Sequence, residues 1–134
     1  MRIDEVEGIG KVLGDKLAKA GCRTTDDLLE QGASASGRER LAEATGISTG
    51  QLLKWCNHVD LMRLDGVGSE YAELLEAAGV DSPSELARRN PANLAQTFQE
   101  LDAARPNWIR RLPSEAMVTG WIDQARGMEK VVSH

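Results

Sequence analysis

Apolar residues along this chain recur at intervals of three and four positions, the spacing that places them on one face of an α-helix. Residues Leu94, Phe98 and Leu101 are one example of this spacing. No segment keeps the strict apolar–polar alternation of a half-buried β-strand. The pattern therefore predicts an all-α protein of about eight or nine short helices.

Polar residues that cap helix N-termini predict where the helices begin. Ser48 and Ser114 each precede an amphipathic segment, and Asn90 precedes a proline that suits the first turn of another helix. Asp26 and Ser84 stand where two shorter helices would start, so the sequence predicts an N-cap role for them as well.

The chain contains an internal repeat. The segment Val-Glu-Gly-Ile-Gly that begins at Val6 returns as Leu-Asp-Gly-Val-Gly at Leu64, an offset of 58 residues. Matching glycines, small residues and leucines continue over about 25 positions. Trp55 matches Trp121 at the larger offset of 66, which indicates eight extra residues in the second copy. Proline and asparagine place these extra residues in a loop near 102–108.

The repeat also predicts how the chain is organised. We expect a first unit over 1–58, a second unit over 59–127 and a C-terminal tail over 128–134. Units this small bury little apolar surface alone, so the two are predicted to pack as one compact domain. The tail carries no helical pattern and is expected either to fray or to dock as an arm.

Each copy opens with the pattern apolar-x-Gly-apolar-Gly, which is typical of the turn in a helix-hairpin-helix motif. Glycine permits positive φ in the turn and lets a ligand approach the backbone. The helix after the turn begins with amides that lack helical partners, so they form an anion site at the positive end of the helix dipole. Ile9 and Val67, between the glycines, are expected to point inward. The predicted fold is two diverged helical bundles of the SAM-like type, each containing a helix-hairpin-helix.

Three segments carry a family resemblance: VEGIGKVLGDKLAKAG, LLKWCNHVDLMRLDGVGSEYAELLEAAGV and RRLPSEAMVTGWIDQA. They resemble an uncharacterised bacterial domain-of-unknown-function family of tandem helix-hairpin-helix proteins. Members of that family are often labelled as predicted flap-endonuclease-like DNA-binding domains. The likeness is to the helix-three-turn-helix part of those nucleases and not to their catalytic part. The resemblance covers nearly the whole chain and implies the fold together with a DNA-binding role.

Charge separates the two hairpins. Segment 8–23 holds four cations and one anion, whereas segment 66–81 holds four anions and no cation. Because phosphate binding needs positive potential, the first hairpin is the predicted nucleic-acid site, with residues Gly8, Ile9, Gly10, Lys11, Lys16 and Lys19. The alternative for it is a solvated lysine face over a structural turn. The second hairpin is predicted to be structural or to bind a partner, with residues Gly66, Val67, Gly68 and Glu70.

A second basic cluster consists of Arg105, Trp108, Arg110 and Arg111. Arginines interleaved with an aromatic side chain suit both base stacking and phosphate contact, so the cluster is a secondary candidate for nucleic-acid binding. The alternative is a loop that a buried tryptophan pins in place while its arginines are solvated.

Composition narrows the function classes. The net charge of −5 weighs against a strong nonspecific DNA binder. Cys22 and Cys56 lie far apart, which argues against a disulfide framework, and no set of metal ligands surrounds them. The carboxylates fall at helical surface spacing, and no nucleophile–base pattern is present, so an enzyme is not expected. No apolar run is long enough to span a membrane, and the cytoplasm is the default location.

Two functions fit these patterns. The first is a non-catalytic module that binds nucleic-acid backbone, DNA or RNA, through the first hairpin and needs no cofactor or metal. The alternative is a protein–protein interaction adaptor in which both hairpins are structural. The acidic balance of the chain keeps the second function open.

Overall fold

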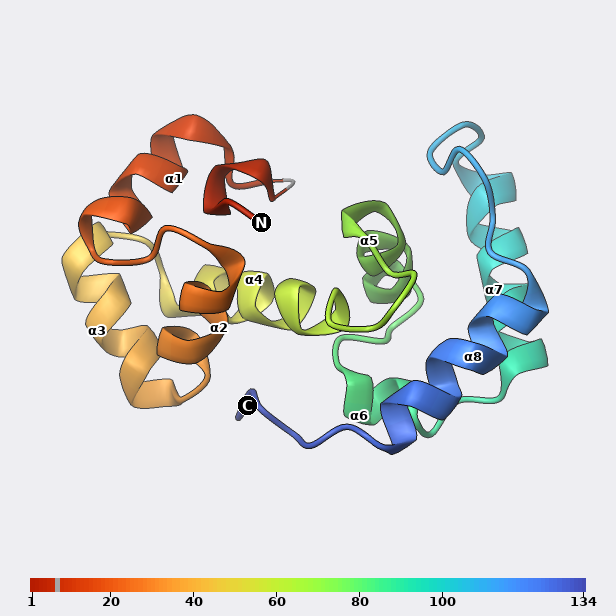
Figure 1. Cartoon of the computed structure of the whole chain (residues 1–134). Coiled ribbons are helices and arrows are strands. Elements are labelled where there is room, and N and C mark those ends of the chain that lie inside the picture. Colours follow the sequence, from red (N-terminus) through yellow and green to blue (C-terminus); the bar gives the residue numbers. More distant parts are fainter. Residues whose placement is uncertain (7) are drawn as a thin grey trace. The chain divides into compact units, whose positions relative to one another are not determined.

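The computed structural model describes residues 1–6 and 8–134, so Glu7, the variable position of the first hairpin pattern, lies outside it. Every regular element in the described part is a helix, which confirms the all-α prediction (Figure 1). The elements are the 3-10 helix η1 (Ile3–Glu5) and the α-helices α1 (Gly10–Lys19), α2 (Thr25–Gly32), α3 (Ala35–Thr45), α4 (Thr49–Leu61), α5 (Ser69–Ala77), α6 (Pro83–Leu86), α7 (Pro91–Ala104) and α8 (Glu115–Arg126).

The helices belong to two compact units. The first unit contains Met1–Asp60 together with Val131–His134, and the second contains Leu61–Lys130. Each unit has a hydrophobic core of its own. The chain therefore completes most of one unit, builds the other, and returns to the first with its last four residues.

Side-chain oxygens start several helices where the sequence predicts them. Ser48 accepts a hydrogen bond from the Gln51 amide at 3.1 Å, which caps α4. Asn90 and Ser114 cap α7 and α8 in the same way. The N-cap prediction for Ser48 is confirmed, and so are the helix starts predicted at Asn90 and Ser114. Each side chain satisfies one of the amides that a helix start leaves without a partner.

The caps of α2 and α6 differ from the prediction. Thr24 accepts from the Asp27 amide at 3.1 Å, and Ser82 accepts from the Glu85 amide at 3.2 Å. The predicted caps, Asp26 and Ser84, are instead second residues of their helices. The hydroxyl two positions earlier wins because its residue has the extended backbone that a cap requires.

The repeat in the sequence is also a repeat in the backbone of the hairpin turns. Gly8 and Gly66 have φ of +91° and +87°. Just past each glycine, the chain closes with the same hydrogen bond of 3.1 Å, from Ile9 to Val6 in one copy and from Val67 to Leu64 in the other. The two turns therefore match in the conformation of this glycine and in the hydrogen bond that follows it.

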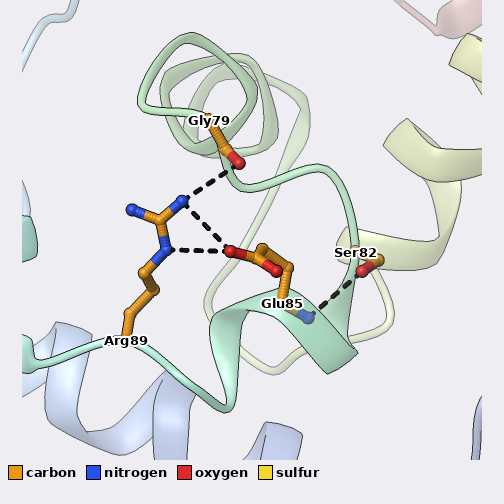
Figure 2. A network of polar contacts seen from close by, with 4 residues as sticks. All are labelled: Gly79, Ser82, Glu85 and Arg89. Atoms are coloured by element: carbon orange, nitrogen blue, oxygen red, sulfur yellow. Dashed lines mark hydrogen bonds and ion pairs between the residues drawn. The ribbon is translucent and has the colours of Figure 1, made fainter.

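The ends of α1 and α5 match as well. Gly21 and Gly79 follow the helices with φ of +93° and +88°, so each helix ends at a left-handed glycine after its alanine cap. The carbonyl of Gly21 accepts from Gln31 Nε2 at 3.0 Å, and that of Gly79 accepts from Arg89 Nη2 at 3.2 Å. Figure 2 shows the second of these contacts, in which Arg89 also reaches the Glu85 carboxylate.

A tryptophan lies beneath each hairpin turn. Trp55 of α4 and Trp121 of α8 are both buried, at 5% and 3% exposure. A side-chain carbon added at Gly8 would lie 3.9 Å from Trp55 Nε1, and one added at Gly66 would lie 3.3 Å from Trp121 Nε1. The glycines match at an offset of 58 residues and the tryptophans at an offset of 66, yet each tryptophan lies next to the glycine of its own copy.

The last four residues dock on the first unit. Val132 is 2% exposed within its core. The Ser133 amide donates to the Ala33 carbonyl at 2.8 Å, and the Ser133 carbonyl accepts from the buried Arg38 guanidinium at 2.7 Å. His134 Nε2 lies 2.9 Å from Asn57 Oδ1. Of the two expectations for the tail, docking is therefore the one observed for Val131–His134, which we name the C-terminal strap.

Candidate nucleic-acid interface

The turn of the first hairpin exposes backbone at Gly8 and Gly10. Both glycines have positive φ, and a side-chain carbon at Gly10 would meet no atom within 4 Å. Ile9 between them is only 4% exposed and packs in the core of the first unit, as Val67 does in the second. The inward residue anchors the turn, and the glycines leave its outer side open to a ligand.

The N-terminus of α1 carries no anion of its own. No side chain caps it, and its first turn contains no acidic residue. Among the described α-helices it is alone in this respect, because each of the others has a side-chain cap or an acidic residue in its first turn. Among residues 1–6 and 8–134, no side-chain cap and no carboxylate of the first turn therefore matches the first amides of α1 and the positive end of its dipole.

The three predicted lysines lie at different heights on α1. Lys11 is in the first turn beside the turn glycines, whereas Lys16 and Lys19 lie in the last turn. With a rise of about 1.5 Å per residue, they stand roughly 8 and 12 Å beyond Lys11 along the helix axis. All three are exposed, and no hydrogen bond or ion pair within the described residues holds them. One phosphate group cannot contact all three, because they differ in height and in their direction around the helix.

The second hairpin is built differently at the same place. Gly68, the counterpart of Gly10, has φ of −94°, and Glu70 stands in the first turn of α5. Glu70 Oε1 accepts a hydrogen bond from the Arg110 amide at 2.8 Å, and the Tyr71 hydroxyl donates to the Arg111 carbonyl at 2.9 Å. The start of α5 therefore already holds a carboxylate and a segment of its own unit.

The first unit has no such segment. Only residues 46–48 separate α3 from α4, whereas residues 105–114 separate α7 from α8. The position that matches Glu70 is Val12, whose side chain is 72% exposed. Seven of the eight extra residues of the second copy thus lengthen a loop that contacts α5, whereas Val12 at the matching position of α1 is exposed.

Residues 7–128 match the model of a protein family described as a domain of unknown function, DUF4332. The chain belongs to this family. No curated protein and no solved structure matches the chain. The family thus covers both units of this DUF4332 protein, including both hairpin turns.

The second basic cluster of this DUF4332 protein lies on the loop after α7. The Arg105 guanidinium stacks over the Trp108 ring at 4.6 Å from its centroid. Trp108 is partly buried against the core of the second unit, while the side chains of Arg110 and Arg111 are exposed. The tryptophan packs against this core, and the arginine side chains face solvent.

The two cysteines are buried and unpaired with each other, and the Asp27 carboxylate serves a helix cap. Burial raises the pKa of the Cys22 thiol to about 11 and that of the Cys56 thiol to about 12, so both are protonated near neutral pH. Amide hydrogen bonds, first from Arg23 and then from Thr24, lower the pKa of Asp27, which serves its helix cap. Over residues 1–6 and 8–134, no three His, Cys, Asp or Glu side chains converge as metal ligands. In the same ranges, no helix is long and apolar enough to cross a membrane.

The sequence pattern did not single out Val12 or Tyr71, and it placed Glu70 only among the residues of a structural or partner-binding hairpin. The contacts of Glu70 and Tyr71 join residues 40 positions apart, so no local pattern reports them. The repeat did contain one usable signal. Aligning the copies places exposed Val12 opposite Glu70, which marks α1 and α5 as chemically different at their starts.

Proposed function

We propose that this protein is a non-catalytic module that binds nucleic-acid backbone, without sequence preference, through its first hairpin. In this proposal both units are diverged helix-hairpin-helix bundles of the SAM-like type, and the turn Gly8–Gly10 approaches a phosphate group. The observation that carries the proposal is the N-terminus of α1, which has no cap and no acidic residue and stands beside the exposed Lys11. A phosphodiester supplies the anion that this helix start lacks.

The two hairpins provide an internal contrast that supports this assignment. Glu70 places a carboxylate at the start of α5, where an anion is favourable, so that helix end is already satisfied. In α1, the matching residue is Val12, and the neighbouring Lys11 adds positive potential. The site that needs an external anion is therefore in the first unit.

The expected affinity is modest. An anion at a helix N-terminus is worth about 0.3–1 kcal/mol, and nonspecific nucleic-acid binding has a Kd of about 10⁻⁴–10⁻⁶ M at physiological salt. The overall charge of −5 opposes a polyanion at long range. Binding should therefore be clearest at low salt and should weaken steeply as salt is added.

The test is fluorescence anisotropy with labelled single-stranded, duplex and flap DNA at 50 and 200 mM salt. Wild type is compared with Lys11→Glu/Lys16→Glu and with the control Lys54→Glu/Lys130→Glu, which changes the net charge equally at exposed lysines outside α1. The proposal expects the first pair to abolish binding and the control to weaken it slightly. Equal losses in both pairs would show that only net charge matters and would remove the site from the first hairpin.

A protein-interaction adaptor is the second candidate. The net charge of −5 favours it over a polyanionic ligand, and Val12, at 72%, is the most exposed large apolar residue of the described part. This function expects no DNA binding at 50 mM salt, and it expects Val12→Ser to reduce association with a partner or with a second copy. Salt-dependent DNA binding that disappears in Lys11→Glu/Lys16→Glu would decide against it.

A further inference from the structure

The loop that covers α5 is held in one conformation by its backbone. We call residues 105–112 the basic loop. Its contacts to α5 use the amide of Arg110 and the carbonyl of Arg111, which bind Glu70 and Tyr71 at 2.8 and 2.9 Å. Ile109, directly before Arg110, is 5% exposed within the core of the second unit. Because only main-chain atoms are engaged, both arginine side chains project into solvent.

Two further features indicate that the basic loop has a defined conformation. The Arg105 guanidinium stacks on Trp108, which restricts both side chains. Asn107 has φ of +67° and is the one residue other than glycine with positive φ among those described. Such a conformation costs free energy and persists where the surrounding contacts enforce it.

Within the described residues the arginine side chains of the basic loop form no ion pair, and the adjacent Glu70 carboxylate binds the Arg110 amide. The three arginines of the loop are exposed, and no acidic residue occurs from 103 to 114. Other arginines in the described part do form ion pairs. Examples are Arg2–Asp4, Arg89–Glu85 and Arg126–Asp123. No ion pair is found there for Arg105, Arg110 or Arg111. Guanidinium groups bind phosphate oxygens through two parallel hydrogen bonds, so this set suits a phosphate backbone.

We infer that the basic loop is a second contact surface for nucleic-acid phosphates, and that Glu70 and Tyr71 are the residues that position it. The inference takes its ligand class from the proposed function but concerns different residues in the other unit. It reverses the meaning of Glu70. By charge alone this carboxylate would repel a phosphate, whereas here it binds the amide that orients the adjacent arginine side chains.

This reversal gives a test that a simple charge effect cannot imitate. Replacing Glu70 removes a negative charge beside the arginines, so electrostatics alone predicts tighter DNA binding for both Glu70→Ala and Glu70→Gln. If Glu70 positions the loop, Glu70→Ala weakens binding because the Arg110 amide loses its acceptor. Glu70→Gln retains an acceptor oxygen and should bind as well as wild type or better.

The experiment is a salt titration of fluorescein-labelled 20-nucleotide single-stranded and duplex DNA by anisotropy. Arg110→Ala/Arg111→Ala removes two phosphate contacts, and log K should then fall less steeply with log salt, by about 0.9 for each contact. Wild type should therefore lose about tenfold more affinity than this variant between 50 and 200 mM salt. Glu70→Ala should weaken binding about threefold or more at 50 mM salt. The control Arg40→Ala/Arg88→Ala makes the same charge change at exposed arginines elsewhere.

Each outcome separates this inference from the proposed function. If Arg110→Ala/Arg111→Ala matches the control while Lys11→Glu/Lys16→Glu loses binding, the first hairpin stands and the basic loop is no binding surface. If Glu70→Ala binds DNA as tightly as wild type at an unchanged Tm, the positioning role is wrong. Should Glu70→Ala unfold, Tyr71→Phe tests the same role, because it removes one hydroxyl and keeps the ring beside Trp121. No binding by wild type at 50 mM salt would overturn both proposals.

Discussion

At the scale of single residues, two exposed glycines of this chain differ in backbone conformation. Gly66 has φ of +87° and lies over Trp121, whereas Gly120 is inside α8 with open space around it. Gly66→Ala should lower the free energy of unfolding by about 1–2 kcal/mol, because a side chain strains this conformation. Gly120→Ala should raise it by about 0.5–1 kcal/mol through helix propensity. Urea unfolding of both variants measures the difference, and a loss of stability in Gly120→Ala would contradict it.

The buried thiols give the protein a pH-dependent stability. Burial raises the pKa of Cys56 from 9.0 to about 12 and that of Cys22 from 9.0 to about 11, so both thiols ionise more readily in the unfolded chain. The contribution of the two protonated thiols to the free energy of unfolding is fully present below pH 9 and is lost as the pH rises towards 11–12. We expect the free energy of unfolding to fall above pH 9, with a shallower fall in Cys56→Ala. An identical slope in that variant would assign the effect to other groups.

At the scale of elements, the sequence predicted those helix starts that depend only on neighbouring residues. Ser48, Asn90 and Ser114 start helices because a side-chain oxygen before an amphipathic segment satisfies the first amides. The three-residue η1 gave no periodic signal, since it completes only about one turn. The position of the extra loop could be predicted from its proline and asparagine, but its docking on α5 depends on contacts 40 residues apart.

The starts of α1 and α5 differ enough for one substitution to test the role of each. Val12→Glu places in α1 the carboxylate that Glu70 places in α5. It should stabilise the first unit by about 0.3–1 kcal/mol through the helix dipole, at little packing cost because Val12 is 72% exposed. The same carboxylate should weaken DNA binding by occupying the anion site.

The control for this prediction is Val12→Gln, which is polar but uncharged. Thermal unfolding and DNA anisotropy are measured on both variants and on wild type. Stability and affinity should move in opposite directions in Val12→Glu and change little in Val12→Gln. A Val12→Glu protein that binds DNA like wild type would show that the start of α1 does not contact phosphate.

At the scale of the whole molecule, the repeat predicts which turns, caps and tryptophans the two units share. It does not predict that the last residues of the chain return to the first unit. Matching turns, caps and tryptophans could be read from aligned residues such as Trp55 and Trp121. The C-terminal strap has no counterpart in the other copy, so the alignment says nothing about where it docks. Its destination depends on Arg38, whose guanidinium is 4% exposed and binds the carbonyls of Gly32, Ala33 and Ser133.

The strap should therefore stabilise the first unit selectively, and two adjacent valines allow a matched test. Val132 is 2% exposed in that core, while Val131 beside it is 37% exposed. Val132→Ala should lower the free energy of unfolding by about 2 kcal/mol, from lost burial and the cavity left behind, whereas Val131→Ala should change it by less than about 0.5 kcal/mol. Amide hydrogen exchange locates the effect. We expect Val132→Ala to speed amide exchange in α2 to α4 and to leave α5 to α8 protected, because Val132 belongs to the core of the first unit. If the strap only lay on the surface, exchange would change in neither set of helices. Equal loss of protection in both sets would mean that the two units unfold as one cooperative body.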